Sequence, residues 1–167
     1  MLAEWWSAQS ASALVAAKRR PGSLFRHSAR DAWLVLVTFS QTLATAAALV
    51  FLAGHGALGN AGAIVLFGAG ICWCSNTVSH NHLHNPLFRS RTVIRAFDLW
   101  LTLLLGVPQT IWKARHVWHH AGEPARERRP LRRAAKLELA LVGGSWLALL
   151  ALAPRQFLLV YVPGYVL

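Results

Sequence analysis

Residues 79–123 read SHNHLHNPLFRSRTVIRAFDLWLTLLLGVPQTIWKARHVWHHAGE, and they contain six of the chain's eight histidines in two clusters, 80–84 and 116–120. On a helix, residues three or four positions apart lie on one face, so histidines within each cluster can point the same way. Neutral imidazole is the commonest nitrogen ligand for iron, zinc, copper and nickel, and this density of histidines favours a metal site. The residues that we expect to converge on it from two helix faces are His80, His84, His116, His119 and His120.

Two further polar residues lie beside these candidate ligands. His82 lies about 200° around the helix from its neighbours, at roughly 100° per residue, so it either orients a ligand or lies outside the site. Glu123 follows His120 by three positions and can orient a ligand by accepting its second N–H. A solvated glutamate at a helix end is the alternative for Glu123, and the spacing does not choose between the two.

The composition indicates a membrane protein, because 55% of the residues are hydrophobic and only 14% are charged. A formal net charge of +11 could also indicate a nucleic-acid-binding protein, so the location of the basic residues decides between these two classes. Five Lys or Arg precede the first long apolar run, eleven lie between Arg89 and Lys136, and the loop 54–60 has none. This asymmetry predicts that both ends of the first two spans, including the N-terminus, are cytoplasmic, with no nucleic acid as partner. The basic residues then face anionic membrane lipid or an acidic electron-donor protein.

The hydropathy pattern predicts an all-α, integral-membrane, multi-pass helical bundle. Residues 1–31 are expected to form a cytoplasmic N-terminal arm, either lying at the membrane interface or mobile. At about 1.5 Å per residue, a helix needs roughly 20 residues to cross a hydrocarbon layer of about 30 Å. The expected membrane domain is 32–167, with spans at about 32–53, 61–78 and 137–153 and a span from 157 that is too short to cross.

The apolar segment between the two histidine clusters, residues 97–112, is short for a membrane span and is interrupted by Gly106 and Pro108. If it crossed the membrane, the two clusters would lie on opposite sides and could not share a metal. We therefore expect an interfacial or re-entrant segment in the cytoplasmic leaflet.

The two clusters and their surroundings resemble the membrane fatty-acid desaturase family, which has three histidine boxes of the forms HxxxH or HxxxxH, HxxHH and a later H/QxxHH. The stretch 80–84, followed by Leu87 and Phe88, is similar to the first box, and 116–120 is similar to the second. The third box is absent from the sequence. The resemblance covers most of the chain from about Asp31 onward, and paired boxes between hydrophobic spans are more specific than either box alone.

The resemblance implies a di-iron centre on the cytoplasmic face, which activates O₂ to remove hydrogen from the acyl chain of a lipid. It implies an electron-donor protein of the ferredoxin or cytochrome b5 type, and it implies iron ligation by His80, His84, His116, His119 and His120. Because five box histidines are too few to hold two irons in the family manner, we expect the chain to be an incomplete, inactive portion of such an enzyme. Two alternatives stay open: a related di-iron hydroxylase or ketolase acting on a sterol, carotenoid or alkane, and a non-catalytic membrane metal-binding protein.

Overall fold

The computed structural model describes residues 23–121 and 133–166, and for 117–121 it describes the backbone alone. The expected all-α class is confirmed for these residues, which form helices and connecting turns and no sheet. In chain order the helical elements are η1 (Ala29–Asp31), α2 (Ala32–Ala47), η2 (Ala48–Leu52), α3 (Gly56–Trp73), η3 (Cys74–Ser79), α4 (His80–His84), α5 (Arg91–Leu105), α6 (Gln109–Ala121), α7 (Arg133–Leu152), α8 (Pro154–Gln156), η4 (Phe157–Tyr161) and α9 (Val162–Val166).

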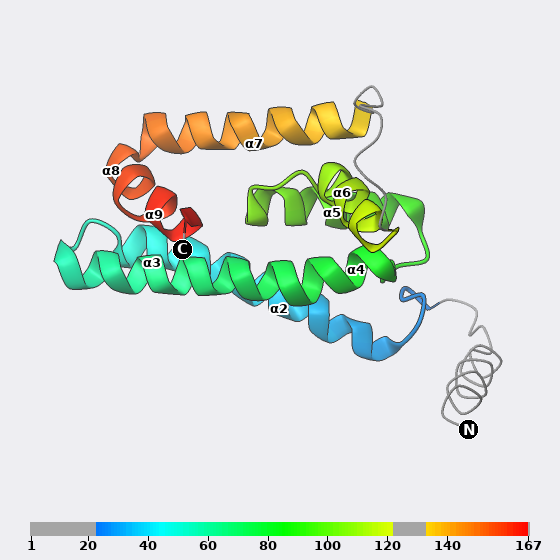
Figure 1. Ribbon diagram of the computed structural model, residues 1–167. Coiled ribbons are helices and arrows are strands. Elements are labelled where there is room, and N and C mark those ends of the chain that lie inside the picture. Colours follow the sequence, from blue (N-terminus) through cyan, green and yellow to red (C-terminus); the bar gives the residue numbers. More distant parts are fainter. Residues whose placement is uncertain (1–22, 122–132, 167) are drawn as a thin grey trace.

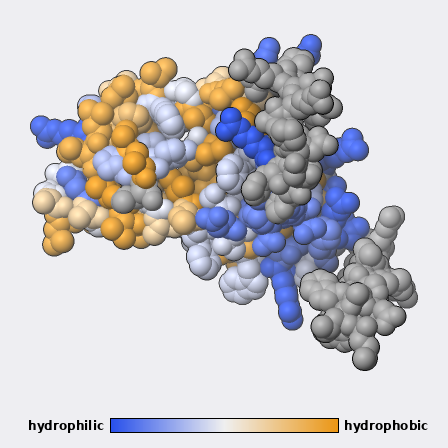
Figure 2. Space-filling model, viewed as in Figure 1, coloured by the Kyte–Doolittle hydropathy of each residue, from blue (hydrophilic) through white to orange (hydrophobic). Residues whose placement is uncertain are grey.

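Three of the described helices are long and apolar enough to cross a membrane: Ala29–Leu52, Gly56–His84 and Arg133–Leu152. They overlap the spans expected at 32–53, 61–78 and 137–153, and the structure is therefore compatible with a membrane protein. Figure 1 shows α7 running alongside α3, with α5 and α6 between them at the α4 end and η4 and α9 between them at the other end. Figure 2 shows hydrophobic residues gathered over the end that holds α8 and α9, and hydrophilic residues at the end that holds α4 and α6.

The second long helix is longer than the pattern predicted, since it continues from Gly56 to His84 without a break. The uncharged turn expected at 54–60 is shorter than predicted, because it ends at His55 and residues 56–60 already belong to α3. Gly54 and Gly56 have φ angles of 86° and 84°. Residues with a side chain rarely adopt this left-handed backbone conformation, which explains why glycine occupies both positions. The first histidine cluster therefore forms the last turn of an apolar helix, and the direction of that helix determines where the cluster lies.

The segment expected to be interfacial or re-entrant is a helical hairpin. Helix α5 ends at Leu105, Gly106 takes a left-handed conformation with φ of 63°, and α6 starts after Pro108. Figure 1 shows α5 ending between the long helices, well short of their far end, and α6 returning towards α4. The Tyr165 hydroxyl donates to the Gly106 carbonyl oxygen at 3.2 Å, which ties the turn of the hairpin to α9. Both histidine segments therefore lie at one end of the molecule.

A hydrophobic core joins the hairpin to the second long helix. Helix α5 has one buried face, because Phe97, Leu101 and Leu105 recur every four residues along it. The Trp100 indole N–H donates to the Thr42 hydroxyl at 3.0 Å, which also ties α5 to α2. The buried members of this core are Cys74, Val78, Leu87, Phe88, Phe97, Leu101, Leu104 and Leu105.

The end of the expected N-terminal arm packs against the loop that follows the first histidine cluster; residues 1–22 of that arm lie outside the described residues. The Arg26 N–H donates to the Leu87 carbonyl at 2.7 Å, and the Arg89 N–H donates to the Leu24 carbonyl at 3.2 Å. The rings of Phe25 and Phe88 stack with centroids 5.5 Å apart. This short pairing holds the loop after α4 in place.

Candidate metal centre

Three histidines from the two clusters meet in space. The ligand-capable nitrogens of His80, His84 and His116 all lie within 4.8 Å of one another. The Nε2 atoms of His84 and His116 are 2.9 Å apart, and the ring centroids of the three pairs are 4.6–4.9 Å apart. The prediction that the two clusters approach each other is therefore confirmed for these three residues, although 32 positions separate His84 from His116 in the chain.

Helix α4 supplies two of the three imidazoles. His80 and His84 are one turn apart, so they project from the same face, as their spacing predicted. A π-helical segment, η3, lies directly before them and changes the helical register over Cys74–Ser79. His80 and His116 are half-buried and His84 is exposed, so the cluster is open to solvent on one side.

Helix α6 supplies the third imidazole, and buried polar contacts hold its first residue. The Gln109 N–H donates to the Thr102 hydroxyl at 3.2 Å. The Ser79 hydroxyl, adjacent to His80 in the chain, donates to Gln109 Oε1 at 2.6 Å. Further along α6, the Trp112 ring stacks on the His116 ring at a centroid distance of 6.1 Å. These contacts connect the residue before the first cluster to the start of the helix that carries the second.

His82 lies apart from the three-histidine cluster. Its Nδ1 accepts the Leu87 N–H at 3.2 Å, so the other nitrogen, Nε2, carries the proton and donates to Asp98 Oδ1, also at 3.2 Å. The ring is buried and contacts the Phe97 ring at a centroid distance of 4.9 Å. Both ring nitrogens are therefore occupied by the protein, and neither of these two contacts is to a histidine of the cluster.

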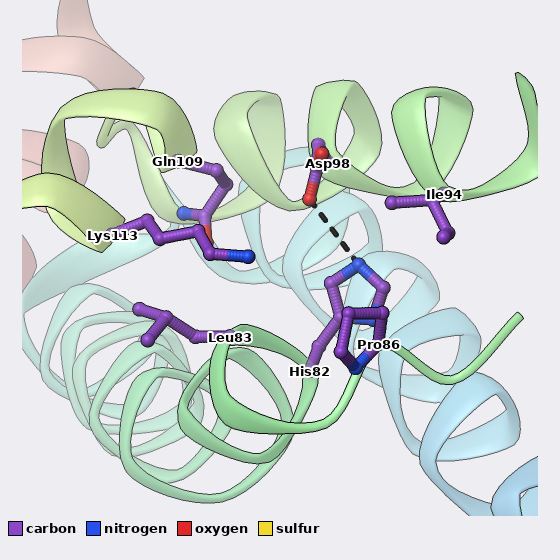
Figure 3. Close-up of a pocket in the computed structure, with 7 residues that line it drawn as sticks. All are labelled: His82, Leu83, Pro86, Ile94, Asp98, Gln109 and Lys113. Carbon is purple, nitrogen blue, oxygen red and sulfur yellow. Dashed lines mark ion pairs between the residues drawn. The ribbon is translucent and has the colours of Figure 1, made fainter. Parts of the chain in front are cut away.

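A small cavity of about 30 Å³ adjoins this His82–Asp98 contact (Figure 3). Figure 3 shows the Lys113 and Gln109 side chains of α6 on one side of it and Asp98 of α5 on the other. At this size the cavity holds one or two waters and no larger ligand.

Sequence reasoning missed three polar residues of these helices: Asp98, which pairs with His82; Gln109, which bonds to Ser79; and Glu138, which bonds to Thr110. Asp98 and Glu138 are isolated carboxylates in apolar helices, and that isolation was a signal, since a carboxylate among apolar residues needs a partner. Gln109 had no such signal. Arg95 of α5 is the charged partner of Glu138.

The two remaining predicted ligands, and the residue predicted to orient one, lie where the structure describes no side chain. His119 and His120 lie in α6, one turn beyond His116, and only their backbone is described. Glu123 lies outside the described residues. Their predicted roles stay predictions.

The donor set of the cluster fits a transition metal. Imidazole suits iron, zinc, copper and nickel, with metal–nitrogen distances of about 2.0–2.1 Å, so nitrogens on one ion lie roughly 3–4 Å apart. The observed separations, from 2.9 Å to 4.8 Å, bracket that range. Small rotations of the side chains would bring three nitrogens to one ion, and this chemistry does not single out iron.

Comparison with known proteins gives no independent assignment. No protein-family model, no curated protein and no solved structure matches this chain. The resemblance to the desaturases therefore rests on the spacing of the histidines and on the apolar segments around them.

Proposed function

We propose that this chain carries a histidine metal site of a membrane di-iron, O₂-dependent fatty-acid desaturase. The observation that carries the proposal is the meeting of His80 and His84 with His116 at one end of the apolar helices. The convergence of these three histidines supports a shared metal site.

The distribution of charge supports placing this site on the cytoplasmic side. Exposed cations lie around the cluster, among them Arg89, Arg91, Lys113 and Arg115. Residues 54–60, at the other end of the first two long helices, include no Lys or Arg. By the positive-inside rule, the histidine end and the N-terminal arm face the cytoplasm. There the cations meet anionic lipid headgroups and an acidic electron donor of the ferredoxin or cytochrome b5 type.

Bound iron would supply the activation of O₂ for removing hydrogen from an unactivated C–H bond. In desaturation, one O₂, two electrons and two protons convert a –CH₂–CH₂– unit of the acyl chain to –CH=CH– with release of two waters. The electrons come from the donor protein and the protons from solvent, which reaches the open side of the cluster.

The chain's own residues hold and orient the imidazoles. The described residues contribute His80, His84 and His116, and the box pattern adds His119 and His120. A later H/QxxHH box would complete the coordination in the manner of the resembled family.

The test compares the chain with an extended form that carries a desaturase segment containing a third box. Each is expressed in a membrane with iron and an electron donor, and iron per chain and lipid oxidation products are measured. We expect substoichiometric iron and no turnover from the chain itself. The extended form should bind stoichiometric iron and yield an O₂-dependent unsaturated lipid, with both lost on His84→Ala. A hydroxylated product would instead indicate the related hydroxylases, and a stoichiometric metal without oxidation in the extended form would indicate a metal-binding protein.

The proposed orientation of the chain in the membrane predicts from which side each position reacts with a membrane-impermeant thiol reagent. In a Cys72→Ala, Cys74→Ala background, single cysteines replace four exposed residues: Ala57, Asn81, Arg91 and Arg115. We expect Asn81, Arg91 and Arg115 positions to react from the cytoplasmic side and the Ala57 position from the other side, because a re-entrant hairpin returns to the side from which it entered. Labelling of the Asn81 and Arg115 positions from opposite sides would exclude a shared site.

A further inference from the structure

Helix α7 contains a fully buried carboxylate, Glu138, whose side chain has 0% exposure. It lies within Arg133–Leu152, one of the helices apolar enough to cross a membrane. A carboxylate in such a position is costly unless hydrogen bonds and an opposite charge compensate it. The contacts of Glu138 therefore indicate what its buried carboxylate does.

Those contacts join all three helices of this part of the molecule. Glu138 Oε2 accepts the Thr110 backbone N–H at 2.8 Å, and Oε1 accepts the Thr110 hydroxyl at 2.9 Å. Arg95 of α5 donates from Nη1 to Oε1, and its Nη2 donates to the Ala134 carbonyl of α7 at 3.2 Å. The negative charge is thus balanced by Arg95, and both carboxylate oxygens are used.

Glu138 also completes the start of α6, the helix that carries the second histidine cluster. The first N–H groups of a helix have no partner within it. In α6, Gln109 donates to Thr102 of α5 and Thr110 donates to Glu138 of α7, while Ile111 and Trp112 both donate to the Pro108 carbonyl. A carboxylate at this end also interacts favourably with the helix dipole. The first two N–H groups of α6 are therefore satisfied by other helices, which set where α6 begins and how it is tilted.

We propose that Glu138 is a positioning residue that holds α6 so that His116 stays against His80 and His84. His116 follows Thr110 by six residues, or roughly 9 Å along the helix axis at 1.5 Å per residue. A tilt of about 10° at the start of α6 would therefore displace His116 by roughly 1.5 Å, whereas metal sites tolerate about 0.5 Å. The proposal rests on the proposed function only in taking the cluster to be a metal site.

The test has a metal-binding arm that uses Co²⁺ alone as probe, on the full chain in lipid nanodiscs. Co²⁺ affinity and its visible ligand-field spectrum are measured for the unmodified chain, Glu138→Ala, Glu138→Gln and the control Thr38→Val. Thr38 is buried to the same degree, but its hydroxyl bonds to Leu34 within its own helix, so its removal does not touch the hairpin. We expect Co²⁺ affinity to fall about tenfold or more in Glu138→Ala, within the range for groups that support metal ligands. Glu138→Gln should fall less, because the amide oxygen still accepts from Thr110, and Thr38→Val should be unchanged.

A second arm needs no metal and separates this proposal from the proposed function. Spin labels on cysteines at the exposed positions Asn81 and Arg115, in the Cys72→Ala, Cys74→Ala background, report the distance between the two histidine segments. We expect one narrow distance distribution in the unmodified chain and a broadened or shifted one in Glu138→Ala and, to a smaller extent, Glu138→Gln. Unchanged distances in Glu138→Ala would overturn the positioning role. If Glu138→Ala fails to fold, Glu138→Gln decides the question, because it loses the charge that pairs with Arg95, and unchanged distances there would overturn the role. A broadened distribution together with no Co²⁺ binding by the unmodified chain would uphold the positioning role and reject the metal site.

Discussion

Replacing His116 with alanine is expected to weaken metal binding by the chain more than about 100-fold. Loss of a group that merely supports a ligand typically costs 10–100-fold in affinity, and a ligand contributes more than its supports. His116 is the described residue of α6 that reaches His80 and His84, so its removal leaves only the two imidazoles of α4 in the described cluster. Isothermal titration with Co²⁺ or Zn²⁺ measures the change.

His82→Ala is the matched control for His116→Ala, because it removes the same ring from the helix that carries His80 and His84. We expect this variant to keep its metal affinity within about threefold, since both nitrogens of His82 bond to Leu87 and Asp98 instead. Its stability should fall by about 1–3 kcal/mol, because the buried Leu87 N–H and the Asp98 carboxylate lose their partner. Equal loss of metal affinity in both variants would contradict the separation of the two sites.

Replacing Phe97 with alanine is expected to lower the free energy of unfolding by about 3–5 kcal/mol, the usual cost of deleting a buried phenylalanine ring. Phe97 is 4% exposed, and its ring contacts His82 and Phe88 at centroid distances of 4.9 Å and 5.4 Å. Its loss would leave a cavity where α5 packs under α4. Reversible denaturation in mixed micelles measures the change.

Phe51→Ala serves as the control for Phe97→Ala, because Phe51 has the same side chain at 72% exposure, on the η2 turn of the first long helix. We expect its effect to stay below about 1 kcal/mol, since an exposed ring loses few packing contacts. A Phe97→Ala effect as small as that of Phe51→Ala would show that the hairpin does not depend on this core.

The helical class, the positions of the long apolar helices and the two histidine segments could be predicted from the sequence. Each follows from local properties: apolar length sets a candidate span, glycines such as Gly54 and Gly106 mark turns, and the spacing of His80 and His84 places them on one helix face. The short, interrupted segment between the clusters was also informative. It is short for a membrane span, and the requirement that the two clusters share a metal led to the expectation of an interfacial or re-entrant segment.

The orientation of α6 and the role of His82 depended on contacts between residues far apart in the chain. Glu138 lies 28 positions from Thr110 and 43 from Arg95, and Ser79 lies 30 from Gln109. Helical periodicity places a side chain on a face but does not identify what packs against that face. His82 lies about 200° around the helix from His80, and this position alone was compatible with a side chain in solvent or with one bonded to another part of the protein. The packing of α5 against α4 places Asp98 within reach of His82. The local sequence pattern was therefore sufficient to predict the helices and the helix face that carries the candidate ligands. The polar contacts around the cluster depend on the tertiary structure, because they form only when α5, α6 and α7 pack around the Arg95–Glu138 pair.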